Sequence, residues 1–304
     1  MSFEEIYRNQ VALLIDTLPV LNEFDCFALK GGTAINLFFQ DMPRLSVDID
    51  LTYLPIEPRE IFLVNIEAEL EKLKQRLIAR HLVVRDTRNK TGQLTKLLVY
   101  QNDAMIKIEP NFTLRGSVFP CEVKELCQKA QDTFLKYVRT KTLPKADVYG
   151  GKICAALDRC HPRDLFDIKL LLEQGQLSKE VRQAFIIYLA STSRPMHELL
   201  SPQPINDFEF LFNKQFVGMT DEALSHDQLL PIQNILATQL INGFSDEERR
   251  FLLSVKSGEP DWPLMPIIGI DQLPGIQWKL QNINKLDKQK KQIQLDRLKA
   301  VLCM

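Results

Sequence analysis

The chain has 304 residues, of which 45% are hydrophobic and 25% are charged, as is typical of a globular protein that buries a core. Lysine and arginine total 38 against 39 aspartates and glutamates, which excludes a molecule-wide field that attracts nucleic acid or anionic membranes. No apolar run reaches the roughly 18 residues that span a bilayer, and the first residues lack the pattern of a secretion signal. We therefore expect a cytoplasmic protein with no membrane partner.

The hydrophobic pattern of the first half predicts a mixed sheet with flanking helices. Helical spacing and strict alternation distinguish the two kinds of element, and short polar connections suit hairpins. The predicted elements are a helix over 3–22 interrupted at Pro19, a strand over 27–29, a turn at Gly31 and Gly32, a helix over 34–39, a strand over 47–53, a helix of about 20 residues from near Pro58, and strands over 81–87, 95–101 and 104–112.

From Ala146 onward the pattern changes to helices. Helices are predicted over 148–159 and 162–172, within 179–256, and over 283–302, and a proline-rich segment over 257–275 is expected to be irregular. The last helix before that segment should begin at Ser245 with a capping box to Glu248. The fold class is therefore α+β, with one domain over 1–145 and a helical domain over 146–304.

Asp48 and Asp50 form the first candidate site. Residues at i and i+2 of a strand point to the same face, so both carboxylates can project together while Ile49 and Leu51 bury the other face. Paired carboxylates suit Mg²⁺, which prefers oxygen ligands and is shared with substrate phosphates. Alternatively, the two aspartates are only the solvated face of an edge strand.

Gly31 and Gly32 form the second candidate site. Glycines at the start of a helix let backbone N–H groups approach an anion, although such a turn often serves only as a connection. A phosphate-binding turn followed by a strand with paired carboxylates would supply both parts of a metal–triphosphate site. The combination predicts an enzyme that handles a nucleoside triphosphate.

These segments resemble a known family. Leu29-Lys30-Gly31-Gly32-Thr33-Ala34, followed by Arg44-Leu45-Ser46-Val47-Asp48-Ile49-Asp50-Leu51, is similar to the opening of the AbiEii/AbiGii toxin family of bacterial nucleotidyltransferases, within the polymerase-β-like superfamily. Lys152-Ile153-Cys154-Ala155-Ala156-Leu157-Asp158-Arg159 and Arg163-Asp164-Leu165-Phe166-Asp167 resemble that family's second conserved block. The two blocks occur in the family's order.

The resemblance implies roles for individual residues. Asp48 and Asp50 would hold the metal and act in catalysis, and Lys152 and Asp164 of the helical domain would complete the catalytic site. The nucleotide would be bound by Gly31, Gly32, Thr33, Ser46 and Lys152. Lys152 could instead be an exposed helix lysine, and Asp167 is the alternative to Asp164.

Glu109 is the candidate for a third metal ligand, which is common in this superfamily. It lies on the predicted strand face opposite Ile106 and Ile108. Pro110 directly after it could instead mark an edge strand with a solvated glutamate.

The resemblance also implies a toxin of a toxin–antitoxin or phage-defence pair, with a cognate antitoxin encoded nearby. Such an enzyme would use Mg²⁺ or Mn²⁺ and a nucleoside triphosphate, and its expected acceptor is the 3′ end of tRNA. The basic residues over 285–299 could contact RNA, or they could be the solvated face of a terminal helix. The alternatives are transfer to a protein or a small molecule such as an antibiotic, and a nucleotide-binding module without catalysis.

Overall fold

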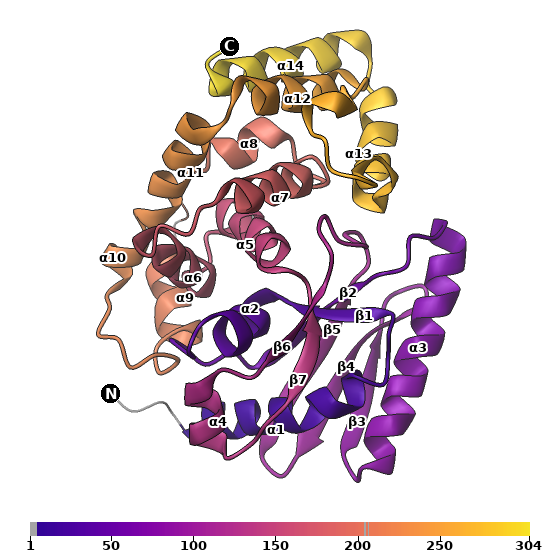
Figure 1. Cartoon of the computed structure of the whole chain (residues 1–304), viewed down its shortest axis with the longest axis vertical. Helices are drawn as coiled ribbons and strands as arrows, with labels where there is room; N and C mark the ends of the chain where they lie inside the picture. The colour runs from indigo at the N-terminus through magenta and orange to yellow at the C-terminus, as the bar shows by residue number, and fades with distance from the viewer. Residues whose placement is uncertain (1–4, 204, 206) are drawn as a thin grey trace. The chain divides into compact units, whose positions relative to one another are not determined.

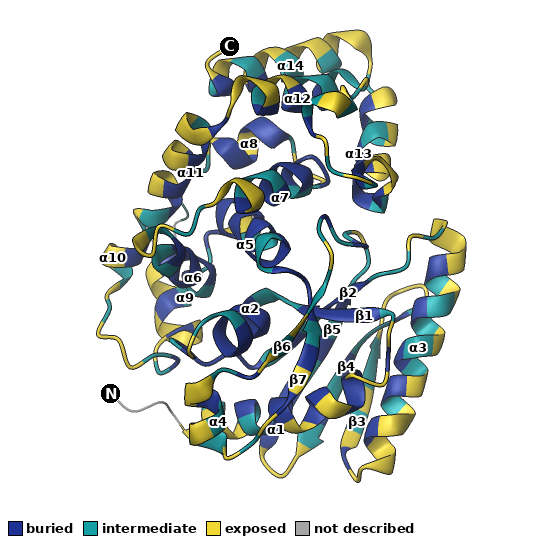
Figure 2. Ribbon diagram, viewed as in Figure 1, coloured by how far each residue is buried: buried dark blue, intermediate teal, exposed yellow. Residues whose placement is uncertain are grey.

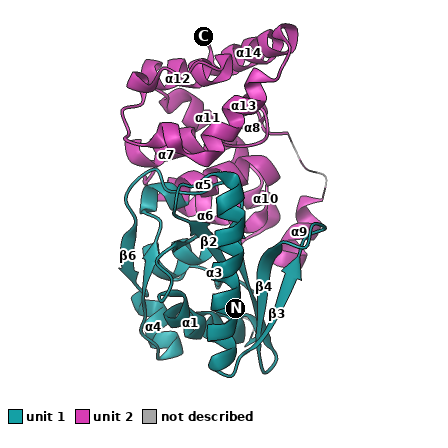
Figure 3. Cartoon of the chain, turned by 90° about the vertical axis from the view of Figure 1, so that its right-hand side faces the viewer, with its two compact units in different colours: residues 1–148, 217–223 teal, residues 149–216, 224–304 magenta. Residues whose placement is uncertain are grey.

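The computed structural model describes residues 5–203, 205 and 207–304 of the chain (Figure 1). These residues form two compact units (Figure 3). The first unit extends to Val148 and includes Val217–Ala223, and the second unit consists of Tyr149–Phe216 and Leu224–Met304. Among the described residues, no helix is long and apolar enough to cross a membrane.

A seven-stranded mixed sheet forms the first unit, in the order β3-β4-β5-β2-β1-β7-β6. The β2–β5 and β1–β7 pairs are parallel and the other pairs are antiparallel. The α+β class with a mixed sheet is thus confirmed. The strands are β1 (Phe27–Lys30), β2 (Asp48–Tyr53), β3 (Val83–Arg88), β4 (Leu94–Gln101), β5 (Ala104–Asn111), β6 (Glu122–Glu125) and β7 (Arg139–Thr142).

Helices cover the sheet where its strands bury apolar side chains. In β5, residues alternate between buried and half-buried along the whole strand, so one face packs and the other stays accessible. α1 packs against β5 and β7, and α3 packs against β3 and β4. The helices of this unit are α1 (Glu5–Leu21), α2 (Gly31–Ala34), which continues as a π-helix (Ile35–Phe39), α3 (Arg59–Ala79) and α4 (Gln128–Phe134).

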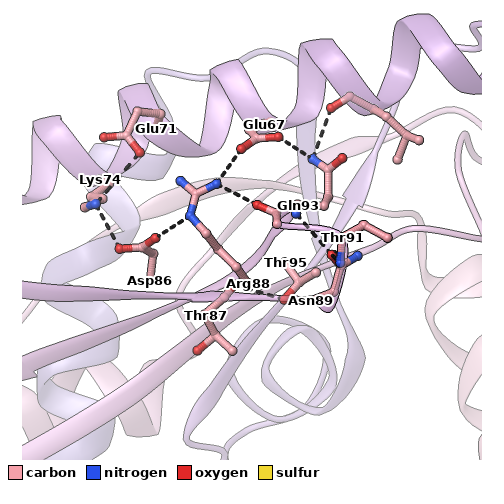
Figure 4. A network of polar contacts seen from close by, with 12 residues as sticks. Glu67, Glu71, Lys74, Asp86, Thr87, Arg88, Asn89, Thr91, Gln93 and Thr95 are labelled. Carbon is pink, nitrogen blue, oxygen red and sulfur yellow. Dashed lines mark hydrogen bonds and ion pairs between the residues drawn. The ribbon is translucent and has the colours of Figure 1, made fainter.

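Burial of an apolar stripe holds α3 on the sheet, while the rest of the helix is half-buried or exposed (Figure 2). Phe62, Ile66, Leu70, Leu73 and Leu77 are fully buried at helical spacing, which contributes about 1.5–3 kcal/mol each. On the solvent side, a polar network connects α3 to the β3–β4 hairpin (Figure 4).

In this network Arg88 Nη1 lies 2.7 Å from Glu67 Oε1, and Lys74 Nζ lies 3.0 Å from Asp86 Oδ1. Gln93 also donates to Glu67, at 2.9 Å. Partly exposed pairs of this kind contribute about 0–1 kcal/mol each. These ion pairs therefore orient the β3–β4 hairpin relative to α3, and they add little to the free energy of unfolding.

The second unit is helical in its described residues. Its first helix, α5 (Lys145–Arg159), begins at the end of the first unit. The remaining helices are α6 (Pro162–Glu173), α7 (Lys179–Leu189), α8 (Met196–Leu200), α9 (Phe208–Gln215), α10 (His226–Leu229), α11 (Ile232–Gly243), α12 (Asp246–Ser257), α13 (Pro274–Asn284) and α14 (Lys288–Leu302), with 3-10 turns at Trp262–Leu264 and Ile270–Gln272.

Capping side chains explain several helix ends in this unit. The capping box predicted at Ser245 and Glu248 is confirmed at the start of α12. The helix predicted over 283–302 is present over Lys288–Leu302, but it is separated from α13 by an interruption at 285–287. Asp287 begins α14 there by accepting a hydrogen bond of 2.8 Å from the backbone N–H of Lys290.

Two further differences from the predicted elements lie in the first unit. Pro19 does not interrupt α1, which continues to Leu21 because Leu18, Val20 and Leu21 are buried. The missing N–H of a proline removes one helical hydrogen bond, and this burial offsets the loss. The strands β6 and β7 and the helix α4 were not predicted from the sequence.

Candidate functional site

β2 carries the paired carboxylates on one face. Asp48 and Asp50 are half-buried, whereas Ile49 and Leu51 between and after them are fully buried. The pattern follows from strand alternation, which places residues i and i+2 on the same side. The structure thus brings the two carboxylates to the same accessible face, and β2 is an interior strand between β1 and β5, not an edge strand.

The glycine turn lies directly beside this face. β1 and β2 are antiparallel with Lys30 opposite Asp50, so Gly31 follows immediately at the level of the carboxylate. Gly31 has a φ of +71°, which L side chains rarely adopt. A Cβ atom on Gly31 would lie 2.2 Å from Oδ2 of Asp50. Only glycine therefore permits both this backbone turn and the close approach of the Asp50 carboxylate.

Gly32 is packed against the segment that leads into β2. A Cβ atom on Gly32 would lie 2.7 Å from Nη2 of Arg44 and 3.0 Å from Oγ of Ser46. Arg44 is almost fully buried and donates to the carbonyl of Leu45 at 2.8 Å. A side chain at Gly32 would thus displace Arg44, so the second glycine has a packing role in addition to any contact with phosphate.

Two buried hydroxyls link the turn to Asp48. Oγ1 of Thr33 lies 2.5 Å from the carbonyl oxygen of Asp48 and 3.0 Å from Oγ of Ser46. A carbonyl can only accept, so Thr33 donates its hydrogen to Asp48 and accepts from Ser46. Thr33 is fully buried and Ser46 is nearly so. The two side chains therefore position the start of β2, and the Thr33 hydroxyl is already engaged by Asp48 and Ser46.

Glu109 lies on the same face of the sheet as the two aspartates. The parallel register pairs Asp50 with Glu109 and Asp48 with Lys107. β5 is an interior strand, so the alternative explanation of Pro110 as the mark of an edge strand is wrong. Oε1 of Glu109 lies 2.7 Å from Nζ of Lys96, so a metal at Glu109 would share this carboxylate with a lysine. Its role stays a prediction.

The donor set fits a magnesium site of two carboxylates. In the described part of the chain, no group of three or more His, Cys, Asp or Glu side chains is arranged to hold a metal. Mg²⁺ commonly takes one or two carboxylates and completes its shell with water and substrate phosphate oxygens. Asp48 and Asp50 on one face, next to a turn that has no side chain, satisfy that smaller requirement.

Lys152, Asp164 and Asp167 form a buried cluster within the second unit. Nζ of Lys152, on α5, lies 2.8 Å from Oδ1 of Asp164 and 3.0 Å from Oδ2 of Asp167, both on α6. All three side chains are at most 7% exposed. Lys152 is therefore not the exposed helix lysine of the alternative interpretation, and both aspartates contact it.

Arg159 distinguishes the two aspartates. Its Nε lies 2.6 Å from Oδ2 of Asp164. Burial alone raises the pKa of Asp164, but the charges of Lys152 and Arg159 outweigh it and hold that pKa well below its usual value. Asp164 is therefore ionised at neutral pH, with two cationic partners.

Three neighbours of the predicted residues were not identified from the sequence. They are Arg44 against Gly32, Lys96 at Glu109 and Arg159 at Asp164. Arg44 and Arg159 stand inside the family-like segments, which is a weak signal. Lys96 depends on the β4–β5 register, which a single sequence does not give.

Comparison with known proteins gives the family. The family described as nucleotidyl transferase AbiEii toxin of type IV toxin–antitoxin systems matches residues 12–282, which is most of the chain. The chain belongs to the AbiEii family. No curated protein sequence matches it.

A solved structure supports the fold. The chain is similar to MenT4, a nucleotidyltransferase toxin from Mycobacterium tuberculosis H37Rv, with a TM-score of 0.55 over 97% of this chain and 93% of that chain. The sequence identity is 11%, so the likeness concerns the fold alone. As an AbiEii toxin, the protein is a nucleotidyltransferase with a nucleotide substrate and a cognate antitoxin.

Proposed function

We propose that this AbiEii toxin transfers a nucleotide, with Mg²⁺ or Mn²⁺, from a nucleoside triphosphate to the 3′ end of tRNA, and thereby blocks growth. One observation carries the catalytic part: the carboxylate of Asp50 lies against Gly31, on the face that it shares with Asp48. Two carboxylates and a glycine turn at the start of a helix are then adjacent, which are the two parts that a metal–triphosphate site uses.

Asp48 and Asp50 would hold the metal. When bound, the ion neutralises phosphate charge and polarises the reacting oxygens. The backbone around Gly31, Gly32 and Thr33 would accommodate the phosphates, and the hydroxyls of Thr33 and Ser46 keep Asp48 in position. The acceptor hydroxyl oxygen forms a new bond to the α-phosphorus and its proton passes to solvent, while the bond from the α-phosphorus to the oxygen bridging to the β-phosphate breaks and pyrophosphate leaves.

In this proposal two residues of the helical domain over 146–304, Lys152 and Asp164, complete the active site of the domain over 1–145. An ammonium at the nucleotide would offset the charge that develops on the leaving pyrophosphate. Asp164 and Asp167 hold the Lys152 ammonium between them, at 2.8 and 3.0 Å. In this proposal they orient the lysine and do not themselves contact the substrate.

RNA as the acceptor is supported by the family resemblance and by the basic surface of α14. Lys288 and Lys290 are exposed there, and Lys285 precedes them in the exposed connection from α13. Phosphate contacts by such lysines are the sequence-independent part of RNA binding.

Labelled nucleoside triphosphates, Mg²⁺ and total cellular RNA, incubated with the pure protein, test the proposal. We expect label at the 3′ end of tRNA, and none with the Asp48→Asn variant. Label on protein or on a small molecule would show that RNA is not the acceptor. Absence of transfer to any acceptor would contradict the proposed catalysis.

A further inference from the structure

The second unit contains two buried lysines with no acidic partner. Lys256 on α12 is 2% exposed and Lys279 on α13 is 4% exposed. In the described part of the chain, no carboxylate lies within ion-pair distance of either ammonium. Burial of an ammonium is unfavourable by several kcal/mol unless a counter-charge accompanies it. These two lysines therefore need an explanation.

The hydrogen bonds of the two lysines leave donors unused. Lys279 donates to the carbonyls of Thr192 at 2.9 Å and Arg194 at 2.5 Å, and Lys256 donates to the side chain of Gln294. Each ammonium has three N–H donors. One N–H donor of Lys279 and two of Lys256 are therefore not used by these hydrogen bonds. The acceptors are neutral carbonyl and amide oxygens, so they do not compensate the charge of the ammonium groups.

His197 adds an unpartnered polar atom to the same region. It lies on α8, which packs against α14, and α14 packs against α12. Its side chain is 9% exposed, and its Nδ1 atom is buried without a hydrogen-bond partner. Buried polar atoms normally have a partner, so this ring nitrogen can form one further hydrogen bond to a ligand.

The surrounding charges make the region positive. Burial, followed by the charge of Lys256, lowers the pKa of Lys279 to about 8. Burial and the charges of Arg297, Lys256 and Lys279 lower the pKa of His197. Lys291 on α14 lies close to the C-terminal end of α12: its Nζ is 3.0 Å from the Cβ position of Gly258, the residue that caps α12. Glu198 acts in the opposite direction but is paired with Arg194 at 3.4 Å.

We propose that Lys256, Lys279 and His197 form an anion site in the second unit that takes a phosphate group. Several N–H donors of like charge suit a tetrahedral oxyanion, which offers several acceptor oxygens at once. The phosphate could come from an RNA backbone or from free inorganic phosphate. The site does not depend on the proposed acceptor, since only the first of these sources involves RNA.

The first experiment measures thermal unfolding of the full chain in inorganic phosphate and in chloride at equal ionic strength. We expect phosphate to raise the melting temperature by about 2–4 °C, as a ligand that binds only the folded state does. Lys256→Met should abolish this rise without lowering the melting temperature in chloride, because a buried uncompensated charge is removed. The control Lys214→Met, at an exposed position of α9, should keep the full rise.

A purely structural lysine would give the opposite result. Lys256→Met would then be less stable in chloride and would keep the phosphate response, which overturns the site. Equal melting temperatures of the wild type in phosphate and chloride also overturn it. If Lys256→Met does not fold, His197→Phe removes the orphaned nitrogen at similar size, and retention of the full phosphate response by that variant overturns the site.

A second experiment distinguishes the two sources of phosphate. RNA binding is measured in phosphate-free buffer at several salt concentrations for the wild type and Lys256→Met. For an RNA backbone phosphate, the salt slope of the variant is shallower by about 0.7–0.9 and inorganic phosphate competes with RNA. For free phosphate, the two proteins bind RNA equally while only the wild type responds to phosphate.

Discussion

At Gly31 two independent constraints exclude a side chain. The positive φ alone costs an alanine about 1–2 kcal/mol. The second constraint is local, because the position of a Cβ is already occupied by the Asp50 carboxylate at 2.2 Å. The first constraint affects stability and the second also affects the candidate site. Comparison with a glycine that has a positive φ but no such neighbour separates the two effects.

Gly31→Ala should abolish nucleotide transfer, because the new methyl group displaces the carboxylate of Asp50. Gly92→Ala is the matched control: Gly92 has a φ of +82°, but no atom lies within 4 Å of its Cβ position. In urea unfolding Gly92→Ala should lose about 1–2 kcal/mol of stability and Gly31→Ala at least as much, and only Gly31→Ala should lose activity. Equal activity of the two variants would mean that the position of Asp50 is not important for transfer.

Asp48→Asn should lower nucleotide transfer by orders of magnitude with the fold intact. Asparagine has the size of aspartate but lacks the charge that a divalent ion requires in its first shell. The hydrogen bond from Thr33 goes to the Asp48 carbonyl, so the substitution preserves it. Transfer and growth inhibition are measured beside the melting temperature, and normal toxicity of a folded variant would contradict the mechanism.

At the scale of elements, the sequence predicted the long and strongly patterned segments. The strand predicted over 47–53 and the helix of about 20 residues predicted from near Pro58 are present with small changes at their ends. Strands β6 and β7 have four residues each, which is too short for alternation to be distinguished from chance. Their pairing depends on tertiary contacts, such as the β1–β7 register at Leu29 and Thr142.

For the candidate site, too, only the features that follow from strand periodicity could be predicted. The shared face of Asp48 and Asp50 follows from strand periodicity alone, and the approach of Gly31 to Asp50 follows only from the β1–β2 register. Neither the hydroxyl pair Thr33–Ser46 nor the pairing of Glu109 with Lys96 follows from spacing. Contacts between strands that are distant in sequence decide these details.

The ion pairs between α5 and α6 predict a pH dependence. Asp164 has a lowered pKa in the folded state, so its contribution to stability is complete above its unfolded pKa of about 3.9 and is lost as the pH falls through the folded value. Urea unfolding at pH 7 should show that Asp164→Asn is less stable than the wild type by about 3–5 kcal/mol, because Lys152 keeps only one carboxylate.

This difference between wild type and Asp164→Asn should decrease as the pH falls from about 5 to below 4. Asp158→Asn serves as the control, since Asp158 pairs with Arg194 at a partly exposed position. A difference that stays constant with pH would show that Asp164 stabilises the helices by packing rather than by its charge.

For the whole molecule, family membership fixes the chemistry but not the acceptor. One fold can serve different substrates, so the likeness to MenT4 at 11% identity does not identify the acceptor of this chain. The net charge of −1 provides no general attraction to RNA. Any RNA binding must therefore come from a local surface, and the exposed lysines of α14 are the candidates.

The double variant Lys288→Glu and Lys290→Glu tests this surface. Both residues are exposed in the first turn of α14, where acidic residues favour the helix dipole, so the fold should not be weakened. If both lysines contact RNA phosphates, the Michaelis constant for RNA should rise and the salt slope should become shallower by about 0.7–0.9 per contact. The nucleotide Michaelis constant should not change. Transfer to RNA at several salt concentrations measures both effects, and identical slopes for wild type and variant would exclude α14 as the RNA-binding surface.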